Sequence, residues 1–213
     1  MTDGPDVLRR VLGDDVPDVS RETLDRLHAF QKLLEQWQRR MNLVGPDTLP
    51  RFWSHHVADG AFAYRTAPDA GRWIDLGAGA GLPGLVIAML AAGDGRRTRV
   101  DLVEANARKC AFQRAAVLET GLRAGPVAVA IHPVRIEAFA ADGPHVLTAR
   151  ALAPLDRLLD HMRTLGSSRA LFLKGERYAD EIEAARRRHR FDVAVHEHPL
   201  RRGSVLLDVR PTP

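Results

Sequence analysis

Apolar and polar positions follow one rhythm before residue 70 and another after it. The early part carries an apolar stripe at helical spacing, made of Leu24, Leu27, Leu34, Trp37 and Met41. Ser20 precedes this stripe and is a suitable N-cap, because its hydroxyl can accept a hydrogen bond from a free N–H of the first turn. A second helical pattern follows at residues 52–57. Residues 1–70 are therefore predicted to form a helical cap, which ends at a turn rich in Pro and Gly.

After residue 71, short apolar segments alternate with helical ones. Strands are predicted at 73–76, 99–103, 127–131, 145–149 and 170–174, with helices between them, notably at 107–120 and 155–165. Such alternation is typical of a parallel sheet that is covered on both faces. Two last strands, at 193–197 and 204–209, are separated by a short segment that favours an antiparallel hairpin. We predict an α/β fold for residues 71–213, which forms one compact unit with the cap.

The composition indicates a globular protein with one core but does not specify its function. The 213 residues are 45% hydrophobic, which is enough for one good core, and the net charge of +4 permits a polyanionic partner without demanding one. Cys110 is the only cysteine, which excludes an intrachain disulfide and a cysteine zinc site. Residues 76–93 carry no charge, but five glycines and Pro83 interrupt them, so a glycine loop and a buried helix explain them better than a membrane span. We see no signal peptide and expect a cytoplasmic monomer without a metal ion.

The most informative segment is residues 75–84, which read Asp-Leu-Gly-Ala-Gly-Ala-Gly-Leu-Pro-Gly. A predicted strand runs into a loop with glycine at every second position, and a helix follows. Missing side chains let the backbone approach a ligand, and a helix start offers unpaired N–H donors, so this segment predicts a nucleotide site. One interpretation is the dinucleotide pattern GxGxxG, formed by Gly79, Gly81 and Gly84 with Glu104 further on.

Two acidic side chains flank this loop. Asp75-x-Gly77-x-Gly79-x-Gly81 also matches the first motif of S-adenosylmethionine-dependent methyltransferases. Asp75 favours this second interpretation, because its carboxylate suits the cationic amino group of the methionine moiety and would repel a pyrophosphate. Glu104, at the carboxyl end of the next predicted strand, can accept hydrogen bonds from both ribose hydroxyls of either nucleotide. It can instead cap the helix that follows.

Further segments from about Gln36 to Gly175 match the motifs of one known family. They are Asn42-Leu43, His56-x-x-Asp59, 75–84, 104–109, Arg135-Ile136-Glu137, 148–151 and Leu173-Lys174-Gly175. In these segments the chain resembles the small-subunit ribosomal RNA guanine-N7 methyltransferases, once called glucose-inhibited division protein B. The match covers most of the chain.

This resemblance implies a class I S-adenosylmethionine-dependent methyltransferase fold, which is Rossmann-like with a seven-stranded, mostly parallel sheet. It implies S-adenosylmethionine as the methyl donor and N7 of a guanine in 16S ribosomal RNA as the acceptor, either in free RNA or in the small ribosomal subunit. Carried over by position, cofactor contacts would come from Gly77, Leu82, Ile136, Glu137 and Arg150. The loop itself adds Asp75, Gly79 and Glu104 to the cofactor-binding candidates.

Methyl transfer to guanine N7 needs no general base, because N7 has an in-plane lone pair and no proton. The protein has to align the reactants and exclude water, so we predict no acid–base residue. Arg150 follows the fourth predicted strand and can contact the acceptor edge of guanine or a phosphate, or it can pair with Glu137 instead. Lys174 ends the fifth strand at the same rim of the sheet. It either contacts a substrate phosphate or is an ordinary surface lysine.

Three other functions are alternatives. The chain can be a methyltransferase for another nucleic acid or a small molecule, an NAD-dependent oxidoreductase, or a non-catalytic RNA-binding module that keeps the loop. A tight nicotinamide complex would select the second alternative, and RNA binding without methyl transfer would select the third.

Weaker signals concern basic and aromatic residues. A basic cluster made of Arg186, Arg187, Arg188 and Arg190 either contacts phosphates or ends a solvated helix. The pair Arg39-Arg40 is a smaller cluster of the same kind. Trp37, Phe52 and Trp53 can stack on a base, but their helical spacing favours packing of the cap onto the sheet.

Overall fold

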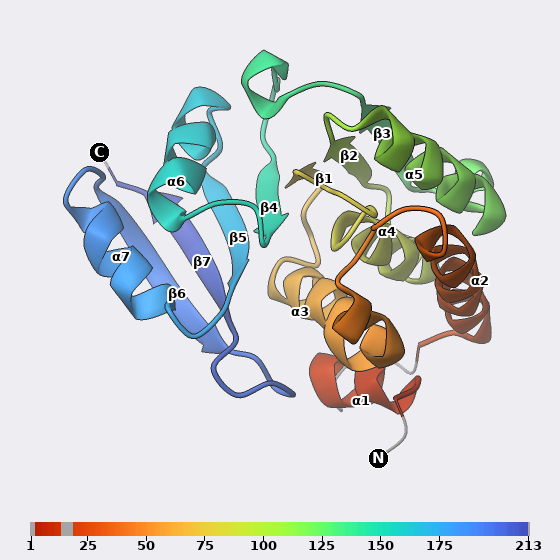
Figure 1. Cartoon of the computed structure of the whole chain (residues 1–213). Helices are drawn as coiled ribbons and strands as arrows, with labels where there is room; N and C mark the ends of the chain where they lie inside the picture. Colours follow the sequence, from red (N-terminus) through yellow and green to blue (C-terminus); the bar gives the residue numbers. More distant parts are fainter. Residues whose placement is uncertain (1–2, 14–18, 213) are drawn as a thin grey trace.

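Helices form the first part of the chain and lead into the sheet (Figure 1). The computed structural model describes residues 3–13 and 19–212. The first helices are α1 (Asp6–Leu12), α2 (Arg21–Gln38) and α3 (Ala58–Thr66). A 3-10 segment, η1 (Pro46–Arg51), and one turn of π-helix, η2 (Phe52–Val57), lead directly into α3. The predicted N-cap of α2 is confirmed, because Ser20 Oγ accepts a hydrogen bond from Thr23 N at 3.2 Å.

Within the described residues, seven strands form one sheet. They are β1 (Arg72–Leu76), β2 (Arg99–Val103), β3 (Ala128–His132), β4 (Val146–Arg150), β5 (Arg169–Lys174), β6 (Phe191–Glu197) and β7 (Val205–Pro211). Their order across the sheet is β3-β2-β1-β4-β5-β7-β6. Strands β1 to β5 pair in parallel, and β7 is antiparallel to both β5 and β6. The predicted closing hairpin and the mostly parallel sheet are therefore confirmed.

Three strands begin one residue later than their apolar patterns predict. Patterns at 127–131, 145–149 and 204–209 correspond to β3 at Ala128–His132, β4 at Val146–Arg150 and β7 at Val205–Pro211. Val127 is buried, but the ladder between β2 and β3 starts at the pair Arg99–Ala128, so burial extends one residue beyond the hydrogen-bonded strand. The shift makes Arg150 the last residue of β4, at the carboxyl end of the sheet.

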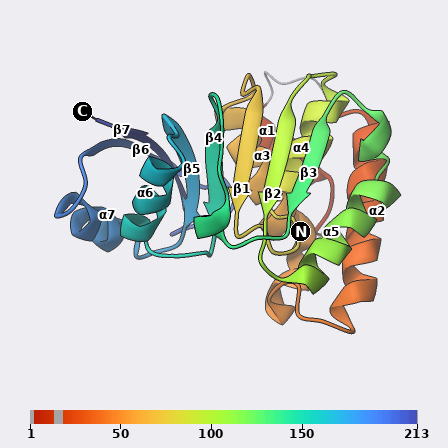
Figure 2. The ribbon, with the colours of Figure 1, turned by 90° about the horizontal axis from the view of Figure 1, so that it is seen from above.

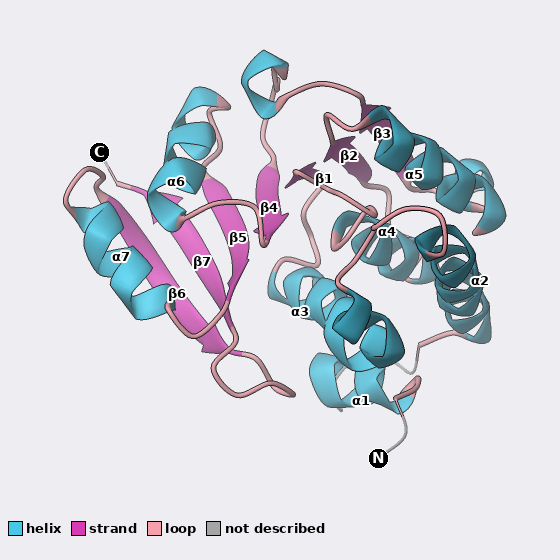
Figure 3. Ribbon diagram, in the orientation of Figure 1, coloured by secondary structure: helices cyan, strands magenta, loops and turns pink. Residues whose placement is uncertain are grey.

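The sheet has a different apolar core on each face, because successive side chains of a strand point to opposite sides. Trp73 packs on the face that is covered by α1, α2, α3, α4 (Gly84–Gly93) and α5 (Ala107–Glu119). Its neighbour Ile74 packs on the opposite face with α6 (Leu155–Thr164) and α7 (Tyr178–Arg186). Figures 2 and 3 show the sheet between these two groups of helices. The predicted buried helix is α4, and no helix of the described part is long and apolar enough to cross a membrane.

The connection between β3 and β4 contains no α-helix. All of residues 133–145 are described, and the only helical element among them is a 3-10 turn, η4 (Ile136–Ala138). A second short turn, η3 (Leu122–Ala124), precedes β3. Ile136 and Glu137 therefore lie in the loop that leaves the carboxyl end of β3.

The middle of the sheet is a topological switch point. From β1 the chain moves outward to β2 and β3, and it then returns to β4 on the other side of β1. In open α/β sheets, ligands bind at the carboxyl ends of the strands where the order reverses. The loops that leave these ends are residues 77–83 after β1 and residues 151–154 after β4, and they enclose the site.

Candidate active site

The glycine loop between β1 and α4 is a turn that side chains would hinder. Gly77, Gly79 and Gly81 have φ angles of 62°, 57° and 77°, in the left-handed region that favours glycine. The N–H of Gly79 donates to Glu104 Oε2 at 2.9 Å, which ties the loop to the end of β2. The loop therefore presents bare backbone at the switch point, as the sequence predicts.

Asp75 lies beneath this loop rather than beside it. Its carboxylate is fully buried, and Oδ2 accepts a hydrogen bond from Gly84 N at 2.9 Å, at the start of α4. A Cβ on Gly84 would lie 2.5 Å from Leu102 Cδ2, so this close approach requires glycine. Oδ1 of Asp75 is buried without a hydrogen-bond partner among the described residues. Burial raises the pKa of Asp75 to about 7, although the Gly84 hydrogen bond opposes the shift.

Glu104 connects the loop to the start of α5. Its Oε1 accepts from Asn106 N at 2.7 Å, while Oε2 accepts from Gly79 N. The capping alternative assigns the wrong residue to the first turn of α5, because Asn106 Oδ1 accepts from Arg108 N at 2.9 Å and from Lys109 N at 3.2 Å. An ionised carboxylate has about four acceptor positions. Glu104 therefore keeps acceptor capacity for further donors, such as ribose hydroxyls.

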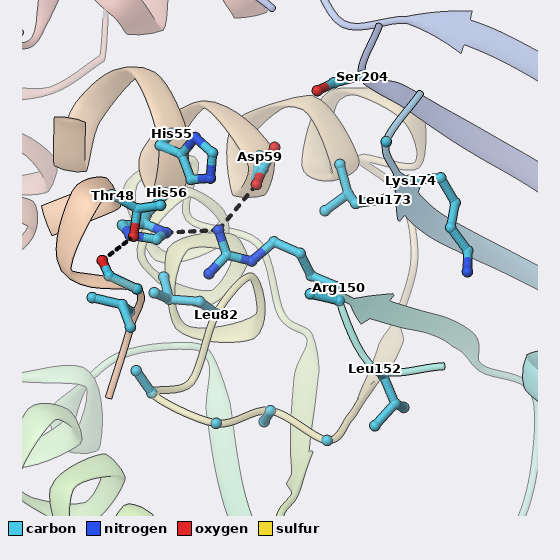
Figure 4. Close-up of a pocket in the computed structure, with 18 of the residues that line it drawn as sticks. Thr48, His55, His56, Asp59, Leu82, Arg150, Leu152, Leu173, Lys174 and Ser204 are labelled. Atoms are coloured by element: carbon cyan, nitrogen blue, oxygen red, sulfur yellow. Dashed lines mark hydrogen bonds and ion pairs between the residues drawn. The ribbon is translucent and has the colours of Figure 1, made fainter. Parts of the chain in front are cut away.

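A cavity of about 700 Å³ opens above the loop, a size typical of small-molecule sites (Figure 4). Five of the sequence-predicted residues line it: Gly77, Gly79, Leu82, Arg150 and Lys174. Asp75 and Glu104 support the loop from below and from the side and are not among the lining residues. Ile136 is half-buried and Glu137 is exposed in the loop after β3, and they do not line the cavity either.

Arg150 crosses the cavity toward the helical part of the chain. Its Nη1 donates to Asp59 Oδ2 at 3.1 Å and lies 2.6 Å from His56 Nδ1 (Figure 4). The predicted alternative of an ion pair with Glu137 is wrong, because α3 begins beside the end of β4 and supplies a buried carboxylate there. The Nε and Nη2 groups of Arg150 have no hydrogen-bond partner among the described residues, so they are available to a ligand.

His56 is held as a neutral imidazole. Because Nδ1 accepts from the guanidinium of Arg150, the proton is on Nε2, which donates to Thr48 Oγ1 at 3.0 Å. The Thr48 hydroxyl in turn donates to the carbonyl oxygen of Gly45 at 2.7 Å. Burial, followed by the charge of Arg150, lowers the pKa of His56 to about 2. This chain of hydrogen bonds fixes the direction of Nη1 of Arg150.

Asp59 is the centre of this cluster. Besides Arg150 it accepts a hydrogen bond from Arg201 Nη2, and His198 Nε2 lies 3.4 Å from its Oδ1. Burial alone would raise the pKa of Asp59, but His198 and the two guanidiniums hold it below the usual range. Arg201 also donates to the carbonyl oxygens of Ser54 and His55 at 2.9 and 3.0 Å. The loop between β6 and β7 is thereby attached to η2.

Sequence reasoning did not find the Asp59–Arg201 contact. The motif His56-x-x-Asp59 was identified only through the family resemblance, and Arg201 is not among the predicted site residues. The two residues are 142 positions apart, so no local pattern relates them. Their charges were the only available signal, since a buried carboxylate requires a cationic partner.

Lys174 is not an ordinary surface lysine, contrary to one of the two predicted alternatives. Its side chain is 8% exposed, and Nζ donates to Ala153 O at 2.6 Å and to Glu181 Oε2 at 2.7 Å. It therefore connects the loop after β4 to α7. An ammonium group has three N–H donors, so one remains for a ligand in the cavity.

Two of the four arginines in the basic cluster form ion pairs, and the guanidinium of Arg186 lies 5.6 Å from the centroid of the Phe191 ring. Arg188 pairs with Asp156 at 2.9 Å and with Asp160 at 3.4 Å, and Arg187 pairs with Glu183 at 3.4 Å. These contacts favour a solvated helix end over a phosphate site. Phe52 and Trp53 are buried and pack the helical part of the chain, as expected from their spacing.

Comparison with known proteins adds independent support. A sequence profile described as GidB, rRNA small subunit methyltransferase G, matches residues 23–202. The chain is 39% identical over 197 residues to the ribosomal RNA small subunit methyltransferase G of Ruegeria sp. (strain TM1040), covering 91% of this chain and 93% of that protein. It is 49% identical over 174 residues to the protein of that name from Paramagnetospirillum magneticum (strain ATCC 700264 / AMB-1), covering 78% of each chain.

Solved structures confirm the predicted fold class. The crystal structure of a methyltransferase from Geobacter sulfurreducens aligns with a TM-score of 0.56 over 93% of this chain and 92% of that one, at 16% identity. At that identity the likeness concerns the fold alone, which is the class I methyltransferase fold with its antiparallel β7. The sequence matches identify the family, and the recognition made from the motifs is confirmed: the chain belongs to the GidB family, rRNA small subunit methyltransferase G.

Proposed function

We propose that this chain transfers a methyl group from S-adenosylmethionine to N7 of a guanine in 16S ribosomal RNA, and that the reaction takes place in the 700 Å³ cavity. Family membership supports the reaction, the cofactor and the RNA substrate. One structural observation supports the location. Bare backbone beside Glu104 and the guanidinium of Arg150 face one cavity at the switch point of the sheet.

The residues present fit S-adenosylmethionine. Gly79 has nothing nearer to an added Cβ than Gly77 O at 3.8 Å, so the loop surface there is open to a ligand. We propose that Gly77, Gly79 and Leu82 contact the cofactor and that Glu104 accepts its ribose hydroxyls. Asp75 supports the loop, and its unpartnered Oδ1 suits the cationic amino group. Ile136 and Glu137 are proposed to border the adenine from the loop after β3.

When bound, S-adenosylmethionine supplies an electrophilic methyl group on a cationic sulfur. The chain has to hold guanine N7 in line with that group, because orientation accounts for several kcal/mol of such a barrier. We propose that Arg150 borders both the cofactor and the guanine. Asp59 and His56 fix its Nη1, and its remaining N–H groups donate to the guanine O6 or to a phosphate.

Lys174 is proposed to position the cavity wall. Two of its three donors hold Ala153 and Glu181, and the third is available to a substrate phosphate. No proton has to be removed from N7, so no side chain is assigned as an acid or a base.

We also propose a cytoplasmic monomer in which residues 1–70 and 71–213 form one unit. Apolar side chains of α1, α2 and α3 share a single core with one face of the sheet, which supports the proposal that the two parts do not separate. Light scattering at several protein concentrations tests the monomer, and a single cooperative unfolding transition tests the single unit.

The deciding experiment is a tritiated-methyl transfer assay. The substrate is ribosomal RNA, and separately the small subunit, from cells that lack this protein, and the modified base is identified after digestion. We expect methylated guanine with the label at N7. Binding of S-adenosylmethionine without transfer to RNA in any state of assembly would contradict the proposal. A complex with a nicotinamide dinucleotide but not with S-adenosylmethionine would favour an oxidoreductase.

A further inference from the structure

A second hollow lies beside the cavity, between the carboxyl end of α2 and the start of α5, two helices that run side by side (Figures 1 and 2). Its volume is about 540 Å³. It is lined by Gln36, Trp37, Arg39, Arg40, Met41, Arg108 and Ala111, and we call it the α2–α5 hollow. None of these residues has a role in the proposed reaction.

Three of its side chains are unneutralised guanidinium groups. Arg39, Arg40 and Arg108 are exposed, and none has a carboxylate within ion-pair distance in the described ranges 3–13 and 19–212. Arg26, within α2, pairs with Glu22 at 2.8 Å instead. Three cations around one concave surface create a positive potential that attracts a polyanion.

The floor of the hollow is apolar and partly aromatic. Trp37 is half-buried, and Phe112 anchors its ring with a centroid distance of 5.6 Å in an edge-to-face contact. Met41 lies beside it and is also half-buried. Guanidinium groups around an accessible aromatic ring are typical of sites for single-stranded RNA, where phosphates bind the cations and an unpaired base stacks on the ring.

Residues that are close in sequence line the hollow and the cavity. Arg108 lines the hollow, whereas the next residue, Lys109, lines the cavity. In the same way, Met41 lines the hollow and Leu43 lines the cavity. A nucleotide chain whose guanine occupies the cavity therefore has the hollow as a neighbouring surface of the right charge.

We infer that the α2–α5 hollow binds a single-stranded segment of ribosomal RNA next to the target guanine. This inference rests on the proposed function. Arg39, Arg40 and Arg108 contact phosphates of that segment, and Trp37 stacks on one of its bases. The site ends toward the middle of α2, where a smaller hollow is lined by Asp25, Lys32 and Glu119 among others and carries mixed charge.

The test compares two sets of arginine substitutions. The first is the triple variant Arg39→Ala, Arg40→Ala, Arg108→Ala. The control is Arg97→Ala with Arg123→Ala, two exposed arginines without ion pairs among the described residues, which precede β2 and β3 at the opposite end of the sheet. Thermal unfolding confirms that each variant folds, and calorimetry measures its affinity for S-adenosylmethionine.

For the triple variant we expect the KM for 16S ribosomal RNA to rise roughly tenfold, with kcat and cofactor affinity unchanged. The loss of three phosphate contacts to a single strand should make the plot of log binding constant against log salt concentration shallower by about 2. The control should raise the KM less than about threefold, because at physiological salt the loss of net charge far from the RNA is largely screened.

Four outcomes are decisive. An unchanged KM and salt slope in the triple variant overturns the inference, and so does an equal loss in the control. A loss on assembled subunits without a loss on free RNA shows that a ribosomal protein occupies the hollow, which also overturns the RNA assignment. If the wild type binds RNA but transfers no methyl group, the proposed function fails, while the salt slopes still decide whether the hollow binds RNA.

Discussion

The two walls of the cavity present different chemical groups. On the β1 side, the wall is backbone, and two carboxylates, Asp75 and Glu104, accept N–H groups of the loop and of α4. On the α3 side, the wall is side chain, and one buried carboxylate, Asp59, holds the guanidinium groups of Arg150 and Arg201. The first wall suits a cationic cofactor and the second suits an anionic RNA. The comparison shows how one cavity can separate two substrates by charge.

The two walls also differ in how far apart their partners lie in the chain. The contacts of the backbone wall join residues 9 and 25 positions apart. Those of the side-chain wall join residues 91 and 142 positions apart. The side-chain wall therefore forms only when the whole fold is in place, and we expect it to be the more sensitive wall to a single substitution.

The largest effect is expected from Asp59→Ala. It leaves two mostly buried guanidinium groups without their anion, which typically costs about 3–5 kcal/mol in the free energy of unfolding. Methyl transfer should be lost as well, because Nη1 of Arg150 loses its carboxylate acceptor. Urea unfolding measures the stability, and the tritium assay measures the activity.

The matched control for that substitution is Asp69→Ala. Asp69 pairs with Arg96 at 2.5 Å, but the side chains of Asp69 and Arg96 are 85% and 41% exposed, so the pair should contribute little. If Asp59→Ala and Asp69→Ala lower the midpoint of unfolding equally, the buried cluster does not hold the side-chain wall together.

Titration of Asp75, in the backbone wall, should make the free energy of unfolding depend on pH. The pKa of Asp75 is about 7 in the folded protein and 3.8 as the reference value, so the fold favours the protonated form. The stability that comes from this group is fully present below about pH 4 and is lost as the pH rises through 7. The loss amounts to at most about 1.4 kcal/mol per pH unit over that window, for a single proton.

The comparison for this prediction is Asp75→Asn, measured by urea unfolding without cofactor from pH 4 to 8. The neutral side chain should remove the pH-dependent loss, so the variant gains on the wild type as the pH rises. If the difference between the two proteins stays constant across this range, Asp75 does not titrate near 7. A proton released from Asp75 on binding S-adenosylmethionine would show that its carboxylate faces the amino group.

Arg150→Lys separates charge from geometry in the side-chain wall. Lysine keeps the positive charge but lacks the planar fork that Asp59 and His56 orient. We expect kcat to fall about 100-fold, as for the loss of one oriented donor, while cofactor affinity changes less than tenfold. Single-turnover transfer measures the first quantity and calorimetry the second. A larger loss in cofactor affinity than in kcat would assign Arg150 to the cofactor alone.

Glu104→Gln tests the acceptor role in the backbone wall. Gln has one acceptor oxygen in place of two, so Gly79 N or Asn106 N loses its partner and fewer lone pairs remain for ribose hydroxyls. A hydrogen bond to a charged acceptor contributes about 1.5–3 kcal/mol, so cofactor affinity should fall at least tenfold. Asn106→Asp is the control, because it keeps the cap of α5 and should leave cofactor affinity within about threefold.

The backbone wall was predicted from the sequence, whereas the contacts of the side-chain wall were not. The loop, the buried helix α4 and Glu104 follow local patterns, in which a strand, glycines and a helix are consecutive, and all were predicted at the right positions. The Asp59 cluster was missed, because it depends on where α3 and the loop between β6 and β7 meet the end of β4. Periodicity places residues on a face of an element, but it does not tell which faces of distant elements meet.

The same limit explains why the sequence did not predict the partners of Arg150 and Lys174. For both, the predicted position at the rim of the sheet is correct, since each ends a parallel strand. Their partners, Asp59 and Glu181, belong to elements whose packing no strand pattern specifies. Charge alone suggested a carboxylate for Arg150, and the predicted acidic partner, Glu137, was the wrong one.

The smallest expected effect concerns backbone strain beside Arg150. In the backbone wall, each left-handed position is a glycine, whereas Ala151 in the side-chain wall has a φ of 51°. Ala151→Gly removes a steric cost of about 1–2 kcal/mol and adds entropy to the unfolded chain, so a net gain of roughly 0.5 kcal/mol in unfolding free energy is expected. Ala153→Gly, in the same loop but without a positive φ, should lose a similar amount, and urea unfolding of both variants measures the difference. If both changes destabilise the protein, Ala151 is not strained, and the two walls differ in their side chains but not in the strain of their backbones.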